Sequence, residues 1–340
     1  MSLPKDGPPP SLRPSMAPSR PSALGRWEVV AKIAGGGLST IYLGRNRDEA
    51  SHPPVALKIV KNELEADGRI ANRFGDEARL LPRLVHPNIV RTLEVGEADG
   101  RQFIVMELMT GMNLAAVTDA CAARGLRVHA DIVAHVAAKV AEALAFAHEL
   151  DDGTGAPLAL IHRDVNPSNI FLTFDGEVKL FDFGLAKSTD AREQTSPGMV
   201  VGKLPYIAPE QIMQLPFDQR SDLFALGTTM WETLTSKRLF KRDTDADTVN
   251  AVQFGPIPDV RASAPDTPGE LWSVVRKALE RNRDNRYPNA RALLADLGGF
   301  VATRDSRAIP SRIAQLLEQL FADEKRRQRG WRKPAIRPMR

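Results

Sequence analysis

Five polar residues stand in an order and spacing that suit work on phosphate groups. Lys58 lies in the apolar run Val-Ala-Leu-Lys, and Glu77 follows 19 residues later. Asp164 ends a His-Arg-Asp motif, Asn169 stands five positions further on, and Asp182 opens Asp-Phe-Gly. A lysine ammonium can neutralise a triphosphate, carboxylate and amide oxygens suit Mg²⁺, and a carboxylate can accept the proton of an attacking hydroxyl group. Together these residue types suit phosphoryl transfer.

The order of these motifs resembles the signature set of the Hanks-type protein kinases. The series closes with Ala208-Pro209-Glu210, and the resemblance covers about residues 27–302. The chain looks most similar to bacterial, myxobacterial-type serine/threonine kinases. This resemblance implies an α+β, bilobal protein kinase-like fold with a small β-rich N-lobe and a larger helical C-lobe. It also implies ATP-dependent transfer of the γ-phosphate to Ser or Thr hydroxyl groups of protein substrates.

The resemblance assigns a role to each of the five polar residues. Lys58 would hold the α- and β-phosphates of ATP, and Glu77 would fix its ammonium group. Asn169 and Asp182 would supply oxygen ligands to Mg²⁺, with Mn²⁺ as a second candidate. Asp164 would orient the substrate hydroxyl and accept its proton.

The same resemblance places the rest of the nucleotide site, with Met106 as the gatekeeper. The expected nucleotide-binding residues are Ile33, Ala34, Gly35, Gly36, Gly37, Leu38 and Ser39 in the phosphate-covering loop, and Ile41, Ala56, Met106, Glu107, Met109 and Phe171 around the adenine ring. The expected supporting residues are Leu81, His162 and Phe183 in a spine between the lobes, Asp222 beneath the catalytic loop, and Arg286 as the partner of Glu210.

The phosphate-covering loop departs from the family pattern. Aligned on the three family glycines, it has Ala34 at the first position and Ser39 at the third, so only Gly36 remains. A missing glycine matters where the backbone must approach a phosphate closely or adopt a positive φ. Gly35 and Gly37 are additional, so we expect a functional loop that binds ATP more loosely.

Two further departures flank the expected proton acceptor. Asn166 replaces the lysine usual two positions after Asp164, and Lys203 replaces the threonine usual before the Ala-Pro-Glu motif. These two positions face each other across Asp164 in the family's geometry. We therefore advance the hypothesis that the Lys203 ammonium compensates for the missing charge; the alternative is that it points to solvent.

The segment after Asp-Phe-Gly suggests control by phosphorylation. Arg163 precedes the catalytic aspartate, where such an arginine commonly receives a phosphate through paired hydrogen bonds. We expect autophosphorylation at Thr195 or Ser196, with self-association of the chain as one route to it.

Two other functions stay open at this stage. A pseudokinase that acts as a scaffold or allosteric partner is favoured by the altered loop and by Asn166, but disfavoured by the complete set of five polar residues. A small-molecule kinase of the same fold is disfavoured by the intact Ala-Pro-Glu motif.

Alternating and helical patterns indicate the elements that must position these residues. Strands are expected at 27–33, 40–45, 55–60, 89–95, 102–107, 170–173 and 177–181, and helices at 67–85, 130–150, 221–235, 270–281, 290–302 and 311–329. The predicted divisions are a disordered Pro/Ser-rich tail at 1–22, a kinase domain at 23–302 with lobes at 23–109 and 110–302, and a helical extension with a basic tail at 303–340.

The charge distribution argues against a general nucleic-acid binder. Of the net charge of +4, residues 1–22 contribute +2 and residues 325–340 contribute +8, which leaves −6 for the remainder. We expect the basic run that begins at Lys325 to be a solvated tail that an acidic partner could attract. The single Cys121 excludes an intrachain disulfide, and no apolar stretch is long enough for a transmembrane segment, so we expect a cytoplasmic protein.

Overall fold

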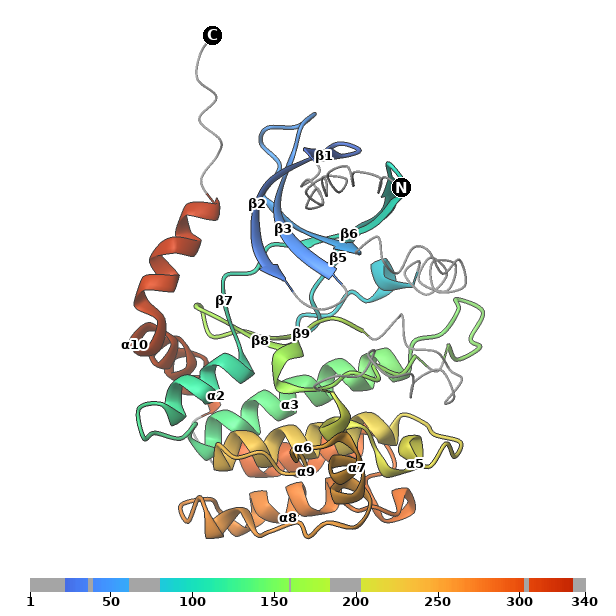
Figure 1. Ribbon diagram of the computed structural model, residues 1–340, viewed down its shortest axis with the longest axis vertical. Coiled ribbons are helices and arrows are strands. Elements are labelled where there is room, and N and C mark those ends of the chain that lie inside the picture. Colours follow the sequence, from blue (N-terminus) through green and yellow to red (C-terminus); the bar gives the residue numbers. More distant parts are fainter. Residues whose placement is uncertain are drawn as a thin grey trace, which may run out of the picture.

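A computed structural model describes residues 22–35, 39–60, 80–158, 160–183, 203–302 and 306–332. The predictions for Gly36, Gly37, Leu38 and Glu77 lie outside these residues, as do those for the segment with Thr195 and Ser196 and for nearly all of the 1–22 tail. Figure 1 shows a curled β-sheet above a larger group of helices, which confirms the predicted α+β, bilobal arrangement.

An antiparallel sheet of six strands forms the N-lobe, in the order β1-β2-β3-β4-β6-β5. Its strands are β1 (Ala23–Leu24), β2 (Trp27–Gly35), β3 (Ser39–Asn46), β4 (Val55–Val60), β5 (Thr92–Ala98) and β6 (Arg101–Glu107). Alternate residues of β4 point to opposite faces, so Val55, Leu57 and Ile59 enter the core of this lobe. Lys58 therefore lies on the opposite face.

The C-lobe is built around two helices, α3 (Ala130–His148) and α6 (Arg220–Thr235), most of whose residues are buried. Its helices are α2 (Leu114–Ala122), α3 (Ala130–His148), α5 (Pro209–Ile212), α6 (Arg220–Thr235), α7 (Asp245–Phe254), α8 (Gly269–Ala278), α9 (Ala290–Ala302) and α10 (Ile309–Arg329). In α6 every residue after Arg220 is buried, which is typical of a helix at the centre of a domain. Figure 1 shows α3 and α6 above α8.

A second, three-stranded sheet lies between the N-lobe and these helices. It has the order β7-β8-β9, with β7 at Gly111–Asn113, β8 at Ile170–Thr173 and β9 at Val178–Leu180. The end of β9 reaches the stretch before β5, because the Leu180 amide donates to Asn88 (2.8 Å) and the Val90 amide donates to Leu180 (2.9 Å). These hydrogen bonds join the two lobes close to Asp182.

Several boundaries differ from the predictions for identifiable reasons. The end of the predicted 67–85 helix is wrong: Leu81–Arg83 form only a 3₁₀ turn, at Pro82, whose ring opposes a continuing helix. Strand β5 begins at Thr92 rather than at residue 89, because Ile89 bridges to Leu180 instead of the N-lobe sheet. The sequence patterns also missed α2 and α7.

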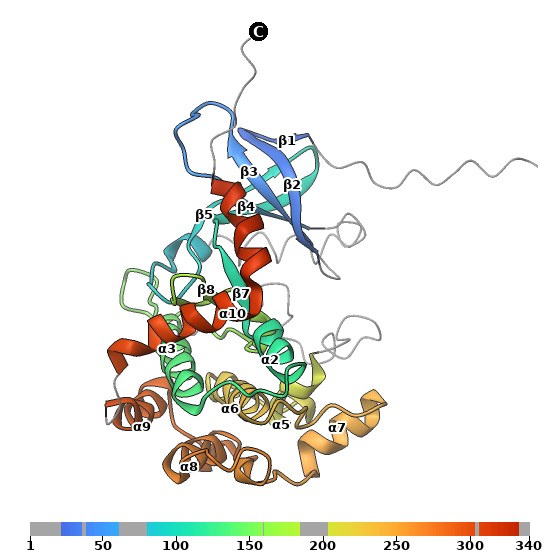
Figure 2. The same ribbon diagram turned by 90° about the vertical axis from the view of Figure 1, so that its left-hand side faces the viewer.

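Helix α10 covers one side of the C-lobe and continues toward β7 (Figure 2). Its buried apolar residues Ile309, Ile313, Leu317 and Leu320 belong to the main core. The chain bends at Phe321, where φ is −137° and ψ is 35°. The basic run that begins at Lys325 continues α10 to Arg329, as the predicted 311–329 helix required, and Arg326 and Arg327 are exposed as expected for solvated residues. Gln328 departs from that expectation because it is buried. Among the described residues, no helix combines the length and apolar character needed to cross a membrane.

Candidate active site

Asp164 is buried and surrounded by donors from its own loop. The Asn169 side-chain amide donates to the Asp164 carbonyl (2.8 Å) and to its carboxylate (2.9 Å). The Asn166 amide donates to the same carbonyl (2.9 Å) and to the other carboxylate oxygen (3.2 Å). Both amides are themselves buried, so the direction of the carboxylate is set by short-range contacts.

Asp222 supports this loop from the first turn of α6. Its carboxylate accepts the amide hydrogens of His162 and Arg163, each at 2.8 Å, and lies 2.8 Å from His148 Nε2. Burial acts to raise the pKa of Asp222, but the hydrogen bond and charge of His148 and the contacts with His162 outweigh it and lower the pKa. Asp222 is therefore a charged anchor, as predicted for it.

Two residues of the site, one in the anchored loop and one in the Asp-Phe-Gly motif, have uncommon backbone conformations. Arg163 has φ of 61° and Asp182, across the site, has φ of 65°. Left-handed conformations cost a side-chain-bearing residue about 1–2 kcal/mol and concentrate at functional sites. The contact between Asp222 and the Arg163 amide helps to maintain one of them.

His162 connects the loop to the Asp-Phe-Gly motif. Its ring lies 4.3 Å from that of Phe183, its Nδ1 lies 3.2 Å from the Asp164 amide, and its Nε2 lies 3.3 Å from the Phe181 carbonyl. The first nitrogen therefore accepts and the second donates, which requires the neutral ring. Burial lowers the pKa of His162, in agreement with this assignment. The predicted contact of His162 with Phe183 is confirmed.

Lys58 and Asp182 meet across the two lobes. The Lys58 ammonium contacts the Asp182 carboxylate, and both side chains are largely buried. The Phe181 amide, one residue before Asp182, donates to the Asn169 carbonyl (3.0 Å). Thus three of the five predicted polar residues converge with Asp164, while Glu77 lies in the part of the chain that the structure leaves undescribed.

The predicted adenine residues come from strands of both lobes. Ile41 pairs with Lys58, and Ala56 pairs with Met106, in the ladders of β3, β4 and β6. Phe171 stands on β8, where it pairs with Lys179 of β9. Ile33, Ala34 and Gly35 end β2 and Ser39 begins β3, on either side of the undescribed tip of the loop. Met109 follows β6 and is partly buried.

A side-chain bridge that sequence reasoning missed crosses this region. Lys179 on β9 contacts the Glu107 carboxylate at 2.9 Å, and the Arg91 amide donates to the same oxygen at 2.9 Å. Glu107 therefore holds the start of the connection between the lobes through its side chain. No motif signals Lys179 or His148, since their partners become neighbours only in the fold.

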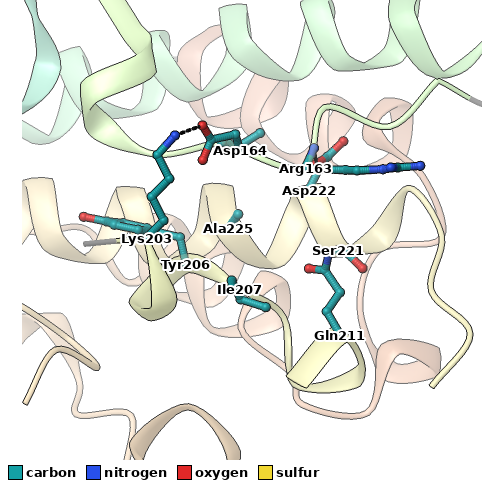
Figure 3. A pocket seen from close by; sticks show the side chains of 10 residues that line it. Arg163, Asp164, Lys203, Tyr206, Ile207, Gln211, Ser221, Asp222 and Ala225 are labelled. Atoms are coloured by element: carbon teal, nitrogen blue, oxygen red, sulfur yellow. Dashed lines mark hydrogen bonds and ion pairs between the residues drawn. The ribbon is translucent and has the colours of Figure 1, made fainter. Parts of the chain in front are cut away.

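Lys203 points to Asp164 rather than to solvent. Figure 3 shows its side chain reaching from the turn before Tyr206 to the Asp164 carboxylate. Its ammonium contacts the same oxygen as the Asn169 amide, and its side chain is 42% exposed. The side chain of Asn166 turns back on the loop, where it also accepts from the Ser168 amide (2.9 Å). One cation from outside the loop thus contacts the Asp164 carboxylate.

A buried ion pair fixes the segment that ends with the Ala-Pro-Glu motif. Arg286 donates to both carboxylate oxygens of Glu210, at 2.7 and 2.6 Å, and Ser221 donates to Glu210 at 2.8 Å. Burial opposes ionisation of Glu210, but the Arg286 hydrogen bonds outweigh it and lower the pKa. The predicted partnership of Arg286 with Glu210 is confirmed.

The oxygen donors of the site fit a magnesium–nucleotide complex. Because the Asn169 nitrogen donates to Asp164, its side-chain oxygen is the atom suited to a cation, and Asp182 supplies a carboxylate. Mg²⁺ is usually held by one or two carboxylates together with the phosphates of a substrate. Lys58 brings a positive charge to the same place, as binding of a polyphosphate requires.

Comparison with known proteins agrees with this geometry. The family described as "Protein kinase domain" matches residues 27–326. The chain is 35% identical over 302 residues to the "Tyrosine-protein kinase MasK" of Myxococcus xanthus, covering 88% of this chain and 47% of the relative. It is 35% identical over 272 residues to the "Serine/threonine-protein kinase PknL" of Mycobacterium tuberculosis, covering 80% and 65%. The chain thus spans less than two thirds of the length of either relative.

Among solved structures, the "PknI kinase domain" of Mycobacterium tuberculosis is similar in fold. The TM-score is 0.62 at 26% identity, and the match covers 84% of this chain and 99% of the other.

Proposed function

This chain belongs to the protein kinase family, and on that premise we propose that it transfers the γ-phosphate of ATP to Ser or Thr hydroxyl groups of proteins. The observation that carries the proposal is the convergence of Asp164, Asn169 and Lys203 beneath the Lys58–Asp182 pair. Besides Asp164, Asn169 supplies the amide and Asp182 the second carboxylate that the chemistry needs. Lys58 and Lys203 supply the two cations.

In the proposed reaction, ATP supplies the phosphoryl group and the chain supplies position and charge. Asp164 orients the incoming hydroxyl and accepts its proton, while Asn166 and Asn169 keep the carboxylate in one orientation. Lys58 would hold the phosphates, and Asn169 and Asp182 would hold Mg²⁺, with Mn²⁺ as the alternative cation. Lys203 would offset negative charge that builds up beside Asp164.

The identity of the acceptor hydroxyl is part of the proposal. The printed names of the relatives include both a tyrosine kinase and serine/threonine kinases. Asn166 and Lys203 depart from the usual serine/threonine pattern. Phosphoamino-acid analysis of the labelled product decides the point: phosphoserine or phosphothreonine supports the proposal, and phosphotyrosine alone contradicts it.

The central experiment compares the chain with Asp164→Asn. We expect γ-³²P-ATP with Mg²⁺ to label a protein substrate, and we expect the variant to lose at least about a hundredfold in rate. Nucleotide affinity should change little, because Asp164 serves the acceptor. Equal, near-zero transfer by both proteins, with nucleotide still bound, would instead identify the second candidate, a nucleotide-binding scaffold, which Ala34 and Asn166 favour.

Regulation and setting complete the proposal. We place autophosphorylation at Thr195 or Ser196, through self-association, and mass spectrometry after incubation with Mg-ATP tests it. A cytoplasmic location is proposed because ATP is the phosphate donor and Cys121 is the single cysteine, buried and unbridged. An acidic partner of the basic stretch that begins at Lys325 remains a proposal of the same kind.

A further inference from the structure

The end of α10 contacts the connection between the lobes. That connection, hereafter the hinge, comprises residues 108–110 between β6 and β7 together with Gly111, the first residue of β7. The Gly111 amide donates to Gln328 Oε1 (2.7 Å), and Gln328 Nε2 donates to the Gly111 carbonyl (3.1 Å). Gln328 is only 5% exposed although charged residues surround it in the sequence.

This pair of hydrogen bonds completes the edge of a sheet. Strand β7 is the outer strand of the β7-β8-β9 sheet, so one row of its backbone groups needs partners from elsewhere. A carboxamide matches a peptide group, because it accepts and donates with the same geometry. Gln328 therefore acts on Gly111 as a further strand would.

Gly111 is the point where such a contact is needed. Its φ is +154°, and a Cβ there would lie 2.1 Å from the Leu172 carbonyl oxygen. Glycine is therefore required, yet glycine also has the greatest backbone freedom. The two hydrogen bonds from Gln328 restrain a residue whose own side chain cannot.

Neighbouring contacts direct the end of α10 and the 3₁₀ turn that follows it (Gly330–Arg332) to the hinge. Arg332 donates to the Thr110 hydroxyl (3.1 Å), and the Lys325 ammonium lies 5.7 Å from the ring centre of Phe174. The Phe174 amide donates to the Thr110 carbonyl (3.0 Å). Two consecutive hinge residues, Thr110 and Gly111, are thus held by Arg332 of the 3₁₀ turn and by Gln328 of α10.

The bend in α10 makes this contact compatible with packing on the C-lobe. Before Phe321 the helix buries its apolar face, and Arg312 pairs with Asp131 of α3 at 3.2 Å. At the bend, Arg124 at the end of α2 donates to the Leu320 carbonyl (3.4 Å). The stretch after the bend is thereby fixed at its start and directed toward Gly111.

We propose that Gln328 is a positioning residue of the nucleotide site, which holds the hinge backbone in the conformation that receives the adenine. The inference rests on the proposed function for the nucleotide, but the contact with the hinge stands independently. It assigns to Gln328, which lies within an exposed basic stretch, a contact with the chain's own hinge.

The test replaces Gln328 with Met, which keeps the length of the side chain and removes both hydrogen bonds to Gly111, together with the one that Gln328 Nε2 donates to Glu324 (2.6 Å). We expect amide exchange across residues 108–112 to accelerate at least tenfold. The Kd for Mg-ADP, measured by calorimetry, should rise about three- to tenfold. The KM for ATP should rise to a similar extent, while kcat should stay within twofold of its value in the unaltered chain. A loss of packing alone would not separate KM from kcat in this way.

Two further variants keep the test decisive. Arg326→Gln is the matched control, because Arg326 pairs with Asp323 on the same helix, and it should leave hinge exchange and Kd unchanged. Arg332→Gln removes only the Thr110 contact and should give a smaller change in the same direction. If Gln328→Met fails to fold, Gln328→Asn, whose amide is one methylene too short to reach Gly111, takes its place. Hinge exchange and Kd within twofold of the unaltered chain in Gln328→Met, or in Gln328→Asn used in its place, would overturn the proposal.

The outcome also separates this inference from the proposed function. If the unaltered chain bound no nucleotide, the proposed function would fail, and with it the role of Gln328 at the nucleotide site. Faster hinge exchange in Gln328→Met would then still establish the contact with Gly111. Normal nucleotide binding with unchanged hinge exchange would overturn the inference alone.

Discussion

The C-lobe buries charge beneath the catalytic loop, whereas the core of the N-lobe sheet is apolar. Among the described residues, the buried Asp, Glu and Arg side chains are Asp164, Glu210, Asp222, Glu232 and Arg286, all in the C-lobe. The N-lobe core consists of Leu24, Trp27, Val29, Val55, Leu57, Ile59, Phe103 and Val105. Apolar packing tolerates exchange of similar residues, but a buried ion needs its own partner in its own geometry. The C-lobe, which positions the acceptor hydroxyl, is therefore expected to tolerate fewer substitutions in its interior than the N-lobe.

Breaking the buried pair of the C-lobe should give the largest effect. Arg286→Met removes both hydrogen bonds to Glu210 and leaves a buried carboxylate without its cation. We expect a loss of about 3–5 kcal/mol in the free energy of unfolding, measured by urea denaturation. A loss below about 1 kcal/mol would show that burial of charge is not what distinguishes this lobe.

Acid should weaken the C-lobe next. Burial lowers the pKa of His162 and of His135, so between their folded pKa and about 6.5 the unfolded chain binds protons that the folded chain does not. Stability is therefore constant above about pH 7 and falls below pH 6.5, by up to about 1.4 kcal/mol per pH unit for each histidine. Urea midpoints at pH 7.5 and 5.5 test this.

The control for the acid effect is His135→Gln, which removes one of the two groups. It should reduce the drop in midpoint between pH 7.5 and 5.5. The carboxylates act in a separate window, because the lowered pKa of Asp222 contributes stability that is lost only at more acidic pH, below about 4. A midpoint that stays equal or rises at pH 5.5 would contradict the prediction.

Removing the half-exposed cation of the site should cost less. Lys203→Ala eliminates the contact with Asp164, and we expect phosphotransfer to slow by about tenfold, or about 1.4 kcal/mol. The paired change Asn166→Lys with Lys203→Thr should restore rate, since it returns the charge to the family's usual position. An unchanged rate in Lys203→Ala would show that the ion pair serves no catalytic purpose.

The surface pair of the N-lobe should give the smallest effect and so completes the comparison. Arg26 contacts Glu94 at 2.6 Å, but its side chain is 53% exposed. We expect Arg26→Gln to lower the free energy of unfolding by at most about 1 kcal/mol, with a further decrease of that effect at high salt. Measured beside Arg286→Met, it isolates burial as the cause of the difference.

Sequence patterns predicted the parts of the site whose residues are tied to short motifs. The motifs of Lys58, Asp164, Asn169 and Asp182 carry their chemistry locally, and their convergence follows from the strands and loops around them. The strongly periodic helices, such as that around Leu144, were likewise evident. These features depend on neighbours along the chain.

What the sequence left undetermined depends on contacts between distant residues. Helix α7 carries only a few buried residues, Thr248, Ala251 and Val252, so its pattern is weak. Gln328 lies in a basic run whose composition indicates solvent, and only its distance from Gly111 reveals another role. Composition reports the average polarity of a stretch, whereas the burial of one side chain such as Gln328 depends on its particular hydrogen-bond partner.

The turn between β8 and β9 packs closely against the start of α10, which indicates that the folded catalytic domain includes this helix. A Cβ on Gly176 would lie 2.1 Å from the Pro310 carbonyl oxygen, so the turn and the start of α10 fit against each other without space for a side chain. A recombinant fragment that stopped at residue 302, where the sequence motifs end, would lose Ile313 and Leu317 and expose the core residues that pack with them. Truncation there would remove part of the core, so a fragment for expression should extend at least to residue 332.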